Sequence, residues 1–253
     1  FVLGSGKAKL VKASGDFGLP DFFLSGLNAA WFRTTCRNMD TDRSVNSALS
    51  PPTRVRRPEN RASEIARAAL ELFVTRGFAA TKLEDVAKEA SVSKGLPYLY
   101  FKNKEELFKA VVSEAIAGPL AEANDVIDRF EGSSEELLRA LVDGFRAFEE
   151  TPAGGVVKLI LAEAGNFPDV AKFYCTNFDV RGRDLFIRTL RRGVENGEFR
   201  PLADLETTAI VILQPLAMFS VWKRSLAPFD PGKVDGDQFY AAYIDFVLKG
   251  LRP

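Results

Sequence analysis

Apolar residues recur every three or four positions over several long stretches of this chain, the spacing that gives a helix one buried face. The first stretch begins near Arg61 and ends at Gly77, a residue that suits the left-handed end of a helix. Its inward face is the set Ile65, Ala69, Leu72 and Phe73. We expect Val86 and Leu99 to complete this small core. No region alternates with period two, so we predict an all-α protein.

Two short helices joined by a tight turn are predicted to follow. The first opens at Thr81, with Glu84 three positions later as its partner in a capping box. The turn is Ser91-Val92-Ser93, and Ser93 is the expected cap of the second helix. The pattern therefore predicts a helix-turn-helix within a three-helix head.

The second short helix is polar or aromatic where a globular helix would normally be apolar. It carries Lys94, Gly95, Tyr98 and Tyr100. Lysine donates to bases or phosphates, and tyrosine offers both a hydroxyl and a flat ring. Two helices crossing over a short turn, the second bearing such groups, fit the major groove of DNA.

These motifs resemble the DNA-binding signature of the TetR family of bacterial transcriptional regulators, densely over residues 61–113. The matching positions are Thr81, the turn 90–93, Lys94-Gly95, the run Tyr98-Leu99-Tyr100-Phe101 and the run 104–107. Residues 161–168 and 197–200 more weakly resemble the regulatory domain of one subgroup. The chain departs from the family at Ser91, where glycine is usual, and at Pro97 inside the second helix.

The residues assigned to DNA lie on the two short helices and at the start of the next one. They are Thr81, Lys82, Ser93, Lys94, Gly95, Leu96, Tyr98, Tyr100 and Lys104. Thr81 and Lys104 stand at helix starts, where free amides favour phosphate. The expected partner is a double-stranded DNA operator. The alternatives are a helical scaffold of the same fold that does not bind DNA, and an enzyme whose catalysis would rest on carboxylates or lysine.

The rest of the chain predicts a larger helical body. Asn103, Ser133, Asp204 and Asp235 are its expected helix caps, and one long helix is expected over 169–196. The helix from Leu205 to Trp222 is apolar almost all round, which favours burial against a second subunit as well as the core. The predicted homodimer contacts are Leu213, Phe239, Tyr243, Phe246 and Val247. The resemblance implies the same arrangement; plain core packing is the alternative.

Aromatic residues are abundant in the body. Most are expected in the core, and some line an apolar cavity, as the resemblance suggests. The candidate pocket residues are Phe145, Phe148, Glu163, Asn166, Phe167, Phe173, Tyr174, Gln214, Met218 and Trp222. Apolar walls with few polar groups suit a small apolar effector of unknown identity.

Composition narrows the chemistry. The chain has 34 basic and 34 acidic residues, no histidine, and only Cys36 and Cys175 as cysteines. Without histidine or a cysteine cluster we expect no metal, no cofactor and no enzyme activity. We expect no disulfide bond, which suits the reducing cytoplasm. The most apolar run, 209–222, is shorter than the roughly 20 residues that cross a bilayer, so no membrane span is predicted.

The organisation expected from these patterns has three parts. Residues 1–58 form a disordered or extra N-terminal segment that ends in a basic arm containing Arg54, Arg56 and Arg57. Residues 59–105 form the helix-turn-helix domain, and residues 106–253 form the regulatory and dimerisation domain. The arm either contacts phosphates or is a solvated linker.

Overall fold

The computed structural model describes residues 58–232 and 234–253, and the regular elements of these residues are all helical. The head contains α2 (Pro58–Arg76), α3 (Leu83–Glu89) and α4 (Leu96–Tyr100). The α-helices that follow are α5 (Lys104–Arg129), α6 (Ser134–Glu150), α7 (Gly155–Glu163), α8 (Pro168–Tyr174), α9 (Val180–Glu195), α10 (Leu205–Ser225) and α11 (Gly236–Leu251). The predicted all-α fold is confirmed. The expectations for the N-terminal segment and its basic arm lie outside the described residues.

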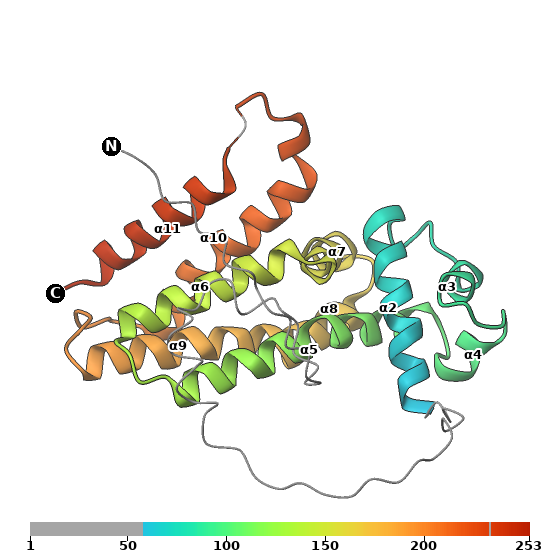
Figure 1. The fold of residues 1–253 in the computed structure, drawn as a ribbon, viewed down its shortest axis with the longest axis horizontal. Helices are drawn as coiled ribbons and strands as arrows, with labels where there is room; N and C mark the ends of the chain where they lie inside the picture. The colour runs from blue at the N-terminus through green and yellow to red at the C-terminus, as the bar shows by residue number, and fades with distance from the viewer. Residues whose placement is uncertain (1–57, 233) are drawn as a thin grey trace, which may run out of the picture. The chain divides into compact units, whose positions relative to one another are not determined.

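The head forms around α2, which packs along the start of α5 (Figure 1). Ile65, Ala69, Phe73 and Val86 are buried as predicted. Leu99 was expected in this core, and that prediction is wrong because its side chain is 81% exposed. Helix α4 is little longer than one turn, and it turns Pro97 and Phe101 inward instead.

Local capping signals predicted most helix starts correctly. The side chains of Asn103, Ser133, Asp204 and Asp235 each accept a hydrogen bond from an amide in the first turn of α5, α6, α10 and α11. Ser93 does not cap α4 through its side chain, because α4 begins at Leu96. The carbonyl of Ser93 accepts the Leu96 amide at 2.9 Å instead.

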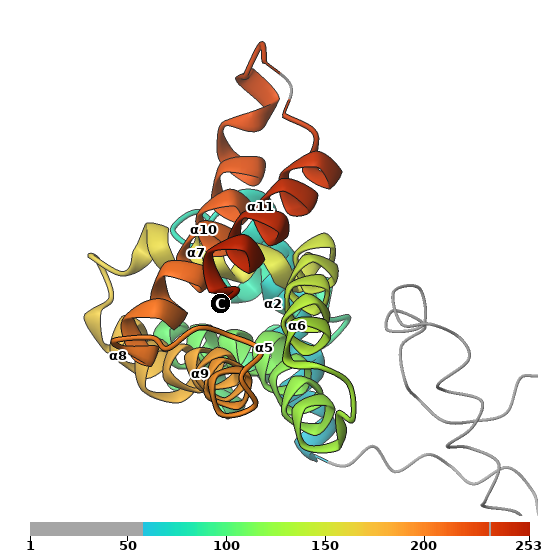
Figure 2. The ribbon, with the colours of Figure 1, turned by 90° about the vertical axis from the view of Figure 1, so that its left-hand side faces the viewer.

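The body is built on α5, α6 and α9, which pack against one another (Figure 1). Helix α10 lies against α9 and α7, and α11 lies against α6. In Figure 2, the end of α10 and the start of α11 project away from the rest of the body. Helices α7 and α8 lie close to the head, since α7 contacts α2 and α8 contacts α5. The α7–α8 turn is therefore well placed to connect the body to the head.

The long helix expected over 169–196 is divided in two. A π-helical turn, Cys175–Asp179, separates α8 from α9 and adds a residue to the turn, which rotates the buried face. Helix α9 ends as predicted at Gly197, whose φ is +72°. The carboxylate of Glu198 then accepts hydrogen bonds from the amide and hydroxyl of Ser134, so the end of α9 caps the start of α6.

Helix α10 corrects the prediction that no stretch is long enough to span a membrane. The helix continues beyond the apolar run on both sides and has 21 residues. By length and composition alone it could cross a membrane. Only 28% of its most apolar window is buried. A helix with one face in a core and another at a subunit interface has the same composition, so this observation alone does not indicate a membrane protein.

Candidate nucleic-acid interface

The helix-turn-helix presents one polar surface because its opposite side is buried. Val86, Ala87 and Pro97 hold α3 and α4 on the head core. Of the residues assigned to DNA, five are exposed: Lys82, Ser93, Lys94, Gly95 and Tyr98. Leu96 and Tyr100 are half-buried. Most of the predicted set is therefore open to solvent on the helix-turn-helix, and its contact with DNA stays a prediction.

The turn between the two helices contains a strained residue. Among the described residues, Ser91 is the only non-glycine with positive φ, at +53°. The left-handed region is unfavourable for residues with a Cβ. This is the position where the sequence departs from the family by lacking glycine, and the backbone keeps the glycine-type conformation.

Lys94 has an intramolecular partner on α3. Its ammonium lies 2.9 Å from a carboxylate oxygen of Glu84, and both side chains are exposed. The hydrogen bond and the negative charge of Glu84 raise the pKa of Lys94 above its usual value. The side chain is therefore held as a cation by the carboxylate of Glu84, and its predicted contact with DNA would compete with this pair.

Thr81 lies in the core and not on the DNA-facing surface. Its side chain is 1% exposed, and its hydroxyl donates to the carbonyl of Gly77 at 2.9 Å. Helix α3 begins two residues later, and Asp85, not Glu84, accepts the amide hydrogen bond from Lys82 at its start. The predictions that Thr81 caps α3 and flanks the groove are both corrected, because tertiary packing uses its hydroxyl to close the loop after α2.

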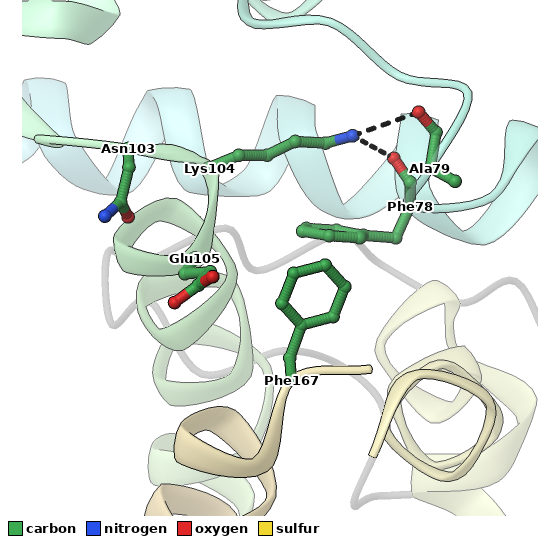
Figure 3. A pocket seen from close by; sticks show the side chains of 6 residues that line it. All are labelled: Phe78, Ala79, Asn103, Lys104, Glu105 and Phe167. Carbon is green, nitrogen blue, oxygen red and sulfur yellow. Dashed lines mark hydrogen bonds between the residues drawn. The ribbon is translucent and has the colours of Figure 1, made fainter. Parts of the chain in front are cut away.

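Lys104 is also engaged inside the protein. Its ammonium donates to the carbonyls of Phe78 and Ala79, and it lies 4.3 Å from the centre of the Phe78 ring (Figure 3). Burial lowers the pKa of Lys104, an effect that the nearby charge of Glu163 opposes. The predicted phosphate contact would compete with these contacts, so the geometry favours a structural role at the junction of head and body.

The candidate pocket residues do not surround one common cavity. Phe145 pairs with Phe148, and Phe173 and the half-buried Tyr174 lie in α8, where the Phe173 ring meets Phe178. Asn166 is exposed and donates to Glu163 at 3.2 Å. On α10, Gln214 and Met218 are exposed, whereas Trp222 stacks on Phe219. Phe167 alone of the set lines a cavity of about 400 Å³, with Phe78, Ala79, Asn103, Lys104 and Glu105 (Figure 3).

A buried carboxylate joins three helices of the body and was missed by the sequence analysis. Glu149 on α6 is 1% exposed and accepts a hydrogen bond from the Tyr240 hydroxyl on α11 at 2.8 Å. Its other oxygen lies 3.4 Å from the ammonium of Lys223 on α10. The available signal was its spacing of four and seven residues from Phe145 and Val142, which puts it on the inward face of α6.

The predicted dimer residues divide into internal and exposed ones. Phe239 stacks on Phe219 with ring centres 3.6 Å apart, and the Tyr243 hydroxyl donates to the carbonyl of Ile212. Leu213 and Val247 are half-buried. Phe246 is 80% exposed. Tyr243 therefore holds α11 to α10 within one chain, and Phe246 is the predicted contact that is open to a partner.

Comparisons with known proteins match both the head and the body. Residues 65–111 match the family described as "Bacterial regulatory proteins, tetR family", and residues 129–235 match "Tetracyclin repressor-like, C-terminal domain". The repressor KstR2 of Mycolicibacterium smegmatis is 26% identical over 195 residues, 77% of this chain and 92% of the relative.

Two solved structures extend the match to three dimensions. The TetR family regulator PfmR from Thermus thermophilus is 26% identical with a TM-score of 0.58, covering 75% of this chain and 99% of that one. The ketosteroid transcriptional regulator KstR2 of Mycobacterium tuberculosis is 25% identical with a TM-score of 0.58, covering 76% and 95%. The helix-turn-helix head, the helical body and both family matches establish that this chain belongs to the TetR family of bacterial transcriptional regulators.

Proposed function

We propose that this protein is a ligand-responsive transcriptional repressor that binds a palindromic operator and leaves it when a small apolar effector binds the body. The observation that carries the proposal is the exposed surface of the helix-turn-helix, where Lys94 and Tyr98 stand on a fully packed head. Lys82, Ser93, Gly95, Leu96 and Tyr100 complete the proposed DNA surface. The similarity to a protein named as a transcriptional repressor supports repression over activation.

The proposed assembly is a homodimer through α10 and α11. Exposed apolar side chains lie on both helices, at Val211, Met218 and Phe246. A second copy covering them would bury the apolar face that α10 leaves open within one chain. A twofold dimer presents two heads to DNA, so its operator is an inverted repeat with half-sites spaced by the helical turn. Such a regulator works in the cytoplasm, and we propose no enzymatic role.

The proposed effector is apolar because the body is rich in aromatic and aliphatic side chains. KstR2, one of the similar proteins, is named as a ketosteroid regulator, which makes polycyclic compounds a reasonable first panel. An effector that prefers the non-DNA conformation shifts the equilibrium by its differential affinity alone. It should raise the melting temperature and release the operator together. Ala217→Trp, at a half-buried position of α10, should reduce that response if a cavity lies there.

The decisive experiment is a titration of the purified protein against the DNA upstream of its own gene and against a random duplex, at several salt concentrations. A repressor should prefer the upstream DNA by about 10³-fold or more, with affinity falling steeply as salt rises. Equal binding to both duplexes would contradict the proposal. No binding to either would favour the alternative of a helical scaffold that has lost DNA recognition.

A further inference from the structure

The ring of Phe78 is the point where the head meets the body. Phe78 follows α2 in the head, and its ring centre lies 5.1 Å from Phe73 and 4.8 Å from Phe108 on α5. A third neighbour comes from the body: the edge-on ring of Phe167, with its centre also 4.8 Å away. Phe167 lies in the turn between α7 and α8, so its ring touches the head from outside the head (Figure 3).

Lys104 fixes the same loop from the other side. Its ammonium holds the carbonyls of Phe78 and Ala79 and lies over the Phe78 ring. The loop after α2 is thus held by the first residue of α5 and touched by a ring from the body. Thr81 closes this loop onto α2 through its hydrogen bonds to the carbonyls of Leu72 and Gly77, so the loop that carries Phe78 leads directly into the helix-turn-helix.

The position of Phe167 is set by the body helices. The amides of Asn166 and Phe167 both donate to the carbonyl of Glu163 at the end of α7, and Pro168 begins α8 directly afterwards. Helix α7 packs on α10, and α8 packs on α5. Phe167 is half-buried and lines an open pocket of about 400 Å³, which leaves space on one side of its ring. A shift of α7 or α8 therefore moves this ring against Phe78 without first breaking a close-packed core.

We propose that Phe167 is a positioning residue that sets the orientation of the DNA-binding head through its contact with Phe78. The inference rests on the proposed function, since it assigns to Phe167 the transfer of the state of the body to the recognition helix. Phe167 has no contact with DNA in this scheme. It acts by holding the head in the arrangement that matches the operator.

The test compares Phe167→Ala with Phe173→Ala. Phe173 is a matched control because it is also a half-buried phenylalanine of the same region, but its ring pairs with Phe178 within the body. Although it was a candidate pocket residue, it lines neither the pocket beside Phe167 nor the proposed DNA surface. Phe167→Ala should weaken operator binding by about 3- to 30-fold, the range seen for residues that couple sites without touching a ligand. The salt dependence should stay unchanged because no phosphate contact is lost. Phe173→Ala should lower the melting temperature similarly and leave affinity near the wild-type value.

Two further variants and one DNA-free measurement separate the possible outcomes. Phe167→Leu keeps most of the apolar volume if the alanine variant does not fold, and it should still weaken binding. Combined with Phe78→Leu, it should cause less than the summed loss, because both changes remove one contact. Hydrogen exchange in residues 83–100 should be faster in Phe167→Ala than in Phe173→Ala, even if the wild type binds no operator and the proposed function fails. Equal exchange and equal affinity in these two variants would overturn the inference.

Discussion

At the scale of single residues, the head combines favourable packing with one strained position. Ser91 adopts the left-handed conformation that glycine adopts without steric conflict. The sequence shows the departure from the family, but it cannot show whether the turn changes shape or the serine accepts strain. The buried sides of α3 and α4 around it hold the turn in place, so the strain is retained.

Ser91→Gly should stabilise the protein. Relief of the left-handed strain is worth about 1–2 kcal/mol, and the greater freedom of glycine in the unfolded chain removes part of that gain. The net effect should be roughly 0.5–1 kcal/mol, a rise in melting temperature of about 1–4 °C. Thermal unfolding measures it. As a control, Gly197→Ala makes the reverse change at another residue with positive φ and should destabilise the protein. A fall in stability for Ser91→Gly would show that the serine side chain stabilises the turn.

The partner of Lys94 predicts an effect on DNA affinity. Glu84 holds the lysine ammonium at 2.9 Å and places a negative charge near the proposed phosphate path. Glu84→Gln should tighten DNA binding by about two- to fivefold at low salt, since exposed pairs contribute up to about 1 kcal/mol. Lys94→Ala should weaken it. Glu89→Gln removes the same charge from the exposed side of α3; equal gains in the Gln variants at 84 and 89 would mean that only net charge matters.

At the scale of elements, success and failure of the sequence predictions have different physical origins. Asn103 and Ser133 were assigned correctly because a cap depends on residues within one turn of the chain. Thr81 and Leu99 were misplaced, and the internal contacts of Lys104 were missed, because these depend on contacts with α2, α5 and the loop between them. No periodicity within a short helix reveals which of its faces a distant helix will cover.

Contacts between elements also make the stability of the fold depend on pH in a predictable direction. Burial opposes ionisation of Glu198, but hydrogen bonds from Asn196 and from the amide and hydroxyl of Ser134 prevail and hold the pKa of this carboxyl below its usual value. The ionised form is therefore favoured in the folded state. The contribution of this carboxylate to the stability of the folded protein is complete above the pKa of glutamate in the unfolded chain, about 4.3. It is lost as the pH falls through the lower pKa that Glu198 has in the folded protein.

Glu198→Gln should lower the melting temperature at pH 7 and flatten its fall under acid conditions. The melting temperatures of variant and wild type should converge as the pH falls through the lowered pKa of Glu198, where the wild-type carboxyl becomes protonated. Glu195→Gln, on the exposed side of α9, is the matched control and should follow the wild-type curve. A constant difference between Glu198→Gln and wild type at all pH values would exclude the ionised carboxylate as the stabilising form.

At the scale of the whole molecule, α10 and α11 leave apolar side chains exposed, and the proposed dimer would cover them. The sequence predicts a dimer interface on these helices, but it could not separate side chains used within the chain from those left open. Phe239 and Tyr243 connect α11 to α10, whereas Phe246, Met218 and Val211 are exposed. Assembly should therefore depend on the second group, and substitutions in the first group would disturb the subunit itself.

Phe246→Asp should convert the proposed dimer into a monomer that keeps its fold. The aspartate would place an unpaired charge against an apolar partner surface, which is strongly unfavourable at an interface core. At micromolar concentration, light scattering should give half the wild-type mass, while circular dichroism remains helical. Arg191→Asp introduces an aspartate on the exposed side of α9 and should leave the mass unchanged.

Because two linked heads bind an inverted repeat more tightly than one, the monomer should also lose operator affinity by about 10²-fold or more. A wild-type protein that is already monomeric under these conditions would contradict the dimer, and a dimeric Phe246→Asp variant would place the interface on another surface.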